Sequence, residues 1–182
     1  MKKSALCLLL ICSLLLTLPA LAFERDQVVP QLEQKVGAFL DAEGYTYTYD
    51  DKTYTMEFVL DSALAGANVS MDLFDDMLSV AAELQIRVPE ENRDKMAKLI
   101  TLINYNLFYS QLRMDYDTGR VINRSYILIE TALPGDGEID VLLNQPLFDL
   151  DAYGDAISKV ALLGMDPQQA FDEARAAIEA RN

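Results

Sequence analysis

The triplet Asp117-Thr118-Gly119 is the place where this sequence comes nearest to a known catalytic signature. Aspartic proteases build their catalytic pair from such triplets, because the reaction needs two carboxylates that share one proton. This chain has a single such triplet, and Tyr116 and Arg120 flank it where protease sites are apolar and small. Between two strands, Asp-x-Gly is also ordinary turn chemistry, since Asp bonds the backbone and Gly adopts positive φ. The sequence therefore favours a turn, and we predict no catalytic residue.

A second acidic stretch begins with the spacing of an EF-hand calcium loop: Asp149, Asp151, Gly154 and Asp155. Tyr153 occupies a ligand position, however, and Val160 stands where the bidentate glutamate is required. The sequence also has no histidine, which removes the commonest metal ligand. We therefore interpret this stretch as the solvated face of a helix, and we expect neither a metal site nor a cofactor.

Four tyrosines form the candidate binding surface. Tyr45, Tyr47 and Tyr49 alternate with threonine, which is typical of a strand with all three side chains on one face, and Tyr54 follows closely. Such a stripe can be an aromatic binding surface, or it can be the face of a sheet that packs on helices. Periodicity alone does not separate these alternatives, and both stay open here.

The first 22 residues have the pattern of a secretory signal peptide. Two lysines precede a short apolar run, and Ala20-Leu21-Ala22 supplies a small-x-small cleavage site. We predict cleavage after Ala22 and a periplasmic or secreted mature protein without a membrane span. Both cysteines, Cys7 and Cys12, leave with that segment, so the mature chain has no disulfide and depends on its apolar core.

The net charge of the chain is −14 at pH 7. A chain with this much acidic surplus repels nucleic acid and anionic lipid instead of binding them. We therefore expect no nucleic-acid partner, and we expect the preferred partners to carry basic residues beside apolar ones.

Hydrophobic periodicity predicts one α+β domain over residues 23–182, with an antiparallel sheet flanked by helices. The order is roughly α-ββββ-α-ββ-αα. Helices are predicted at 29–40, after Pro89 and after Asp166, and strands are predicted at 45–50, 53–60, 68–74, 77–88, 110–116 and 120–130. A further helix is expected to start with Asn144 as its cap and Pro146 in its first turn, and to end at Gly164.

The stretch 77–130 resembles the YbjN family, bacterial proteins whose domain shares its fold with type III secretion chaperones. The matching motifs are "VPEENR", "INYNL", "MDYDTG" and "YILIE", and 142–164 looks like the family's long C-terminal helix, interrupted here by Pro146. The resemblance implies a hairpin turn at 117–119, regulatory roles and no established catalytic residue. It also implies distant relatives that bind unfolded segments of partner proteins, usually as dimers.

These observations favour an exported, non-enzymatic module with a chaperone-like fold that binds a peptide or protein partner and forms a homodimer. The predicted binding residues are Tyr45, Tyr47, Tyr49 and Tyr54. Two alternatives belong to other classes. One is a structural or envelope-associated oligomer that binds no peptide, and the other is a hydrolase that relies on carboxylates alone.

Overall fold

A computed structural model describes residues 27–60 and 67–181, so the predicted signal peptide lies outside the described residues. The elements follow in this order: α2 (Val28–Ala42), β1 (Thr48–Asp50), β2 (Thr55–Leu60), β3 (Ala67–Leu73), β4 (Met77–Arg87), a 3-10 turn (Glu90–Asn92), α3 (Arg93–Asn104), β5 (Gln111–Asp115), β6 (Arg120–Leu128), α4 (Asp136–Leu163) and α5 (Pro167–Glu179). This confirms the predicted α+β class and the order α-ββββ-α-ββ-αα.

The six strands form one antiparallel sheet in the order β1-β2-β3-β4-β6-β5. Strands β1 to β4 are joined as successive neighbours, and the chain passes through α3 before β5 and β6 complete the sheet. In β4, Leu78, Val80, Ala82 and Leu84 face the core, and Ser79 and Ala81 between them are buried as well. Burial alternates along β3, whose odd-numbered residues are buried. This period of two is what an antiparallel sheet with one covered face requires.

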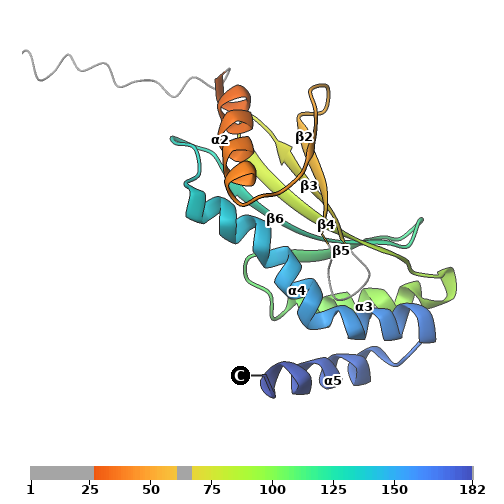
Figure 1. The fold of residues 1–182 in the computed structure, drawn as a ribbon. Coiled ribbons are helices and arrows are strands. Elements are labelled where there is room, and N and C mark those ends of the chain that lie inside the picture. The colour runs from red at the N-terminus through yellow and green to blue at the C-terminus, as the bar shows by residue number, and fades with distance from the viewer. Residues whose placement is uncertain (1–26, 61–66, 182) are drawn as a thin grey trace, which may run out of the picture.

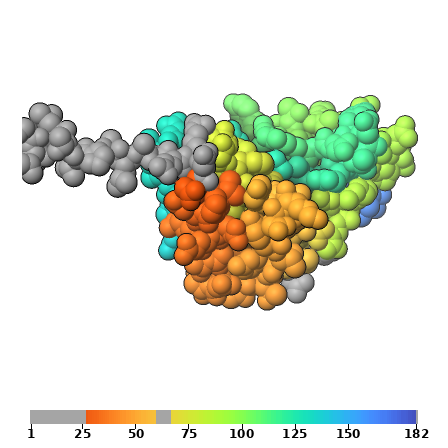
Figure 2. All heavy atoms as spheres, turned by 90° about the horizontal axis from the view of Figure 1, so that it is seen from above, coloured from red at the N-terminus to blue at the C-terminus, as the bar shows by residue number. Residues whose placement is uncertain are grey.

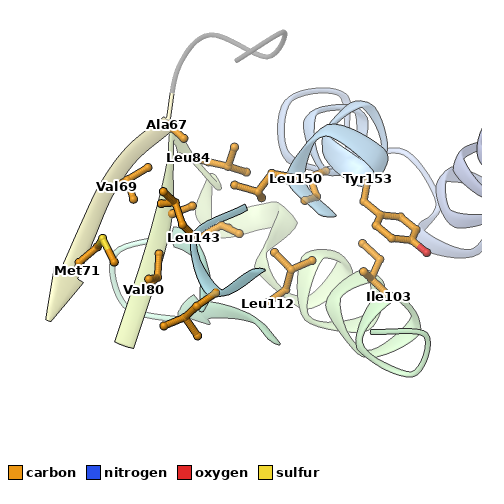
Figure 3. Packing of buried hydrophobic residues seen from close by; sticks show 14 of the residues in the cluster. Ala67, Val69, Met71, Val80, Leu84, Ile103, Leu112, Leu143, Leu150 and Tyr153 are labelled. Atoms are coloured by element: carbon orange, nitrogen blue, oxygen red, sulfur yellow. The ribbon is translucent and has the colours of Figure 1, made fainter. Parts of the chain in front are cut away.

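The helices cover one face of the sheet, and Figure 1 shows α4 running along it from the β6 side towards α3 and α5. Helix α2 contacts β3 and the first part of α4, while α3, α4 and α5 pack on one another. In Figure 3, Leu143 and Leu150 of α4 point towards the strands, and Tyr153 lies beside Ile103 of α3. The opposite face of the sheet carries no helix within the described part of the chain.

Helix α4 starts nine residues earlier than the sequence predicts, with Gly135 at the cap position, so the expected cap at Asn144 is wrong. The helix begins at Asp136, where the carboxylate of Glu138 accepts a hydrogen bond from the Gly135 N–H at 2.7 Å. Pro146 is therefore a residue of the helix interior, where it leaves the carbonyl of Leu142 without its usual donor. The hydroxyl of Ser125 on β6 donates to that carbonyl at 2.6 Å, so the sheet replaces the missing N–H.

The predicted end of α4 and the predicted start of α5 are both found where expected. Gly164 terminates α4 with φ +64, a left-handed conformation that glycine adopts readily. Asp166 caps α5, because its carboxylate accepts hydrogen bonds from the N–H groups of Gln168 and Gln169 at 3.0 and 3.1 Å. No helix among residues 27–60 and 67–181 combines the length and the apolar character that a membrane crossing needs.

Candidate functional site

The Asp-Thr-Gly triplet lies in the turn that joins β5 to β6. The carboxylate that organises the turn belongs to Asp115, which accepts hydrogen bonds from the N–H groups of Asp117 and Thr118 at 3.0 and 3.2 Å. These bonds, together with one from the Thr118 hydroxyl, lower the pKa of Asp115, with the hydroxyl as the largest cause. The sequence predicts that Asp117 bonds the backbone of the turn, but in the structure Asp115, two residues earlier, makes these bonds. The structure gives Asp117 the position of a turn residue.

The acidic stretch of α4 does not form a calcium loop. Asp151 and Asp155 point to solvent, and Asp155 pairs with Lys159 at 2.8 Å. Asp149 is buried, which corrects the expectation of a fully solvated helix face. Its carboxylate accepts hydrogen bonds from Ser110, from Asn123 at 3.4 Å and from Gln145 at 3.0 Å. Across the described ranges, no three acidic side chains are grouped to hold a metal ion.

Three of the four predicted binding tyrosines lie half-buried between the sheet and α2. The rings of Tyr45 and Phe58 are tilted against each other, with 5.3 Å between their centroids. The hydroxyl oxygen of Tyr47 packs against Gly37 of α2, and a Cβ added to that glycine would lie only 2.9 Å from it. Burial, followed by a hydrogen bond to Glu33, raises the pKa of Tyr49 to about 12. Their contacts are thus with the core.

Tyr54 lies apart from the other three, in the β1–β2 turn, where it is 48% exposed and adopts φ +55. The structure therefore does not assemble the four tyrosines into one exposed stripe. Their role in binding stays a prediction.

The bare face of the sheet is hollowed. A cavity of about 730 Å³, here called the sheet hollow, is lined by residues of β1, β2, β3, β4 and β6, among them Thr48, Val59, Ile122 and Arg124, and by Tyr47 just before β1. Small side chains at the centre of β4 deepen it, because Ala81 lies on this face. The floor is therefore formed by the central strand and the walls by longer side chains of the neighbouring strands.

Ion pairs tie the strands of this face together. Glu83 of β4 pairs with Arg87 at 2.8 Å and with Arg120 of β6 at 3.2 Å. Asp72 of β3 pairs with Arg124 of β6 at 3.4 Å and accepts a hydrogen bond from Thr55 of β2 at 3.2 Å. Two of the carboxylates on this face, those of Asp72 and Glu83, are thus paired with guanidinium groups of β4 and β6.

A cluster of exposed aromatic side chains stands beside the sheet hollow. Residues 105–110, here called the aromatic loop, connect α3 to β5, and within it Tyr105 and Phe108 are each 91% exposed and Tyr109 is 70% exposed. A second cavity of about 480 Å³, the aromatic hollow, is lined by Asn104, Leu107, Phe108, Tyr109, Ser110, Gln111, Arg124 and Tyr126. Because Arg124 lines both cavities, the two hollows adjoin.

In Figure 2, the green segment that carries the aromatic loop, β5 and β6 occupies a different part of the surface from the orange α2, β1 and β2. The candidate site therefore runs across the sheet from the tyrosine end to the aromatic loop. Hydrophobic periodicity alone does not single out this loop as a binding site. The available signal was the run "NYNLFYSQ", which has three aromatic residues and no charge between a helix and a strand.

Asn104 anchors the aromatic loop to the edge of the sheet. Its side-chain oxygen accepts from the Leu112 N–H at 2.9 Å, and its side-chain nitrogen donates to the Leu112 carbonyl at 2.9 Å. The pair reproduces the two bonds that an added strand would make with Leu112. At the end of the loop, Ser110 donates to Asp149. The aromatic side chains are thus presented from a loop that is fixed at both ends.

Comparisons with known proteins show a likeness of fold. No protein-family model matches the chain, and no curated protein matches it. The fold is similar to the crystal structure of YbjN from E. coli, which is described as a proposed transcription regulator. The TM-score is 0.52 at 16% sequence identity, over 68% of this chain and 88% of that one. At this identity the likeness concerns the fold alone, and it bears out the resemblance seen in the sequence: the chain has a YbjN-like fold.

Proposed function

We propose that the protein is a non-enzymatic binding module that holds peptide segments of a partner protein against the aromatic loop and the bare face of the sheet. The carrying observation is the 91% exposure of both Tyr105 and Phe108 beside two adjoining hollows. Leaving such rings in water forgoes the free energy of burying them, and clustered exposed aromatics are typical of protein-binding surfaces. The YbjN-like fold supports this proposal at the level of architecture.

Binding through side chains on the face fits this sheet better than addition of a strand at its β5 edge. A peptide that pairs with an edge needs free backbone groups on that edge. At Leu112 those groups are already bonded to Asn104 at 2.9 Å. The face, in contrast, offers adjoining hollows of about 730 and 480 Å³. We therefore place the peptide across the face, with apolar side chains seated in the hollows.

The carboxylates of this face support binding over hydrolysis. A carboxylate that transfers protons works best with a pKa near the working pH, which usually requires burial or a second carboxylate beside it. Asp72 instead pairs with Arg124 at 3.4 Å. Glu83 pairs with Arg87 at 2.8 Å and with Arg120 at 3.2 Å. These contacts are those of structural ion pairs within the sheet.

Regulation by this protein would pass through a protein partner. The YbjN neighbour is described as a proposed transcription regulator. A net charge of −14 disfavours direct contact with DNA, whose phosphates require cationic side chains. A peptide-binding face is compatible with a regulatory role that acts on another protein.

We also propose that the mature protein begins at Phe23 and acts outside the cytoplasm, because the first 22 residues have the order of a signal peptide. Sequencing the N-terminus of the protein recovered from the culture medium and the periplasmic fraction tests this. We expect Phe23 as the first residue. An intact Met1 form embedded in the membrane would contradict the proposal.

Peptide binding is tested with fluorescein-labelled peptides of about twelve residues, chosen from an array screen and titrated by fluorescence polarisation. Replacing Tyr105 and Phe108 together by alanine should weaken binding at least about tenfold, the loss expected for two central aromatic contacts. Leu163→Ala is the matched control, because Leu163 is also exposed but lies at the far end of α4. A wild-type protein that retains no peptide would leave the structural oligomer as the remaining function.

A further inference from the structure

The charge around the aromatic hollow differs from the charge of the whole chain. The run 104–112 has no charged residue, and the charged side chain that lines the aromatic hollow is that of Arg124. On the open side of the sheet, Gln111 pairs with Arg124 and Arg113 pairs with Ile122 across β5 and β6. Two guanidinium groups therefore flank the aromatic loop of a chain with a net charge of −14.

Arg113 has room for an anionic partner. It is exposed on β5, and its Nε and Nη2 both donate to the side-chain oxygen of Gln111 at 3.2 and 3.1 Å. Within the described part of the chain it forms no ion pair. Gln111 lines the aromatic hollow, so this hydrogen bond holds Arg113 next to the cavity. A guanidinium without a carboxylate is a ready donor for bidentate binding.

Arg124 is only partly neutralised within the protein. Its Nη2 contacts Asp72 at 3.4 Å, which is long for a charge-assisted hydrogen bond, and its Nε is buried without a partner. The carboxylate of Asp149 contacts Ser110 of the aromatic hollow, but it is buried and accepts hydrogen bonds from Ser110, Asn123 and Gln145. The Asp149 carboxylate is thus already hydrogen-bonded to three donors within the protein.

We propose that the aromatic hollow takes an extended acidic and apolar peptide segment of a partner protein. An aromatic or leucine side chain of the peptide lies between Phe108, Tyr109 and Tyr126, and an adjoining aspartate or glutamate pairs with Arg113 and Arg124. This specificity rests on the proposed function. It reverses the expectation drawn from net charge, because charges farther away than about 10 Å are screened while contacts at the site are not.

The test uses three peptides with one apolar frame, Phe and Leu at alternate positions, and with Glu, Gln or Lys at the positions between. Each is labelled and titrated by fluorescence polarisation at about 50 and about 300 mM salt. We expect the Glu peptide to bind at least about fivefold more tightly than the Gln peptide, and the Lys peptide to bind most weakly. The advantage of the Glu peptide should shrink at the higher salt.

Arg113→Gln is the informative variant, and Arg175→Gln is its control, because Arg175 is an exposed arginine on α5. We expect Arg113→Gln to weaken the Glu peptide about fivefold and the Gln peptide less than about twofold, while Arg175→Gln changes neither. If the peptides bind but the Lys peptide binds as well as the Glu peptide, this proposal is overturned and the binding function stands. If none of the three binds, both fail.

Discussion

Two features of the β5–β6 turn require glycine at position 119. Its φ is +71, and a Cβ at this position would lie 2.2 Å from the carbonyl oxygen of Val88. The neighbouring backbone bond, from the Val88 N–H to the Gly119 carbonyl at 2.8 Å, holds the two segments together and prevents them from moving apart. A side chain here therefore meets both a steric and a conformational obstacle.

We expect Gly119→Val to lower the free energy of unfolding by at least about 3 kcal/mol, because the clash adds to the strain of positive φ. Asp117→Asn should change it by less than about 0.5 kcal/mol, since that side chain is not the one that organises the turn. Urea denaturation of the two variants beside the wild type measures both values. Equal losses in the two variants would contradict this account of the turn.

Tyr49 should make the protein sensitive to alkali. Burial and the Glu33 hydrogen bond raise its pKa to about 12, above the ordinary value of 10.0. The folded state therefore holds the phenolic proton more tightly than the unfolded state, and stability falls as the pH rises from 10 to about 12.

Denaturation midpoints measured between pH 9 and 12 test this, and Tyr49→Phe should flatten the fall in that window because it removes the titrating group. Tyr105→Phe serves as the control, because Tyr105 is 91% exposed and lies on the aromatic loop, away from Tyr49. An unchanged slope in Tyr49→Phe would show that other groups cause the alkaline loss.

Helix α4 depends on β6 for the backbone bond that Pro146 removes. Ser125 is 1% exposed, and its hydroxyl donates to the Leu142 carbonyl at 2.6 Å. Asn123, on the same face of β6, donates to the Pro146 carbonyl at 3.1 Å. Ser125 thus supplies the donor that Pro146 removes, and Asn123 adds a second hydrogen bond between β6 and the helix backbone.

We expect Ser125→Ala to cost about 1–3 kcal/mol of unfolding free energy, because it leaves a buried carbonyl unsatisfied. In a Pro146→Ala background the same change should cost clearly less, since residue 146 then supplies an N–H to Leu142. A double-mutant cycle by chemical denaturation measures the coupling. Strictly additive losses would mean that Ser125 and Pro146 act independently.

The contrast between the helix ends shows where sequence reasoning works. Asp166-Pro167 predicts the start of α5 correctly, because the cap and its donors lie within three residues. The start of α4 was missed because the group that compensates for Pro146 lies on β6, twenty-one positions earlier in the chain. Strand alternation likewise predicts the sheet, whereas the exposure of the aromatic loop depends on the anchors supplied by Asn104 and Ser110.

At the scale of the whole molecule, we expect a homodimer. Large apolar side chains remain exposed on more than one element, among them Phe148 and Leu163 of α4 and Tyr105 of the aromatic loop. Association would remove such surface from water. Size-exclusion chromatography with light scattering over a range of concentrations should give about twice the chain mass. A mass equal to one chain at every concentration would contradict this expectation.

The pairing of Asn104 with Leu112 also bears on how the protein behaves in crowded solution. A sheet with unguarded outer strands can accept another copy edge to edge, and then another, until a fibre grows. Here β1 at one end is only three residues long, and β5 at the other end is occupied at Leu112 by a side chain of the same molecule. Both features disfavour growth by stacking strands, so we expect copies that meet to join through side chains.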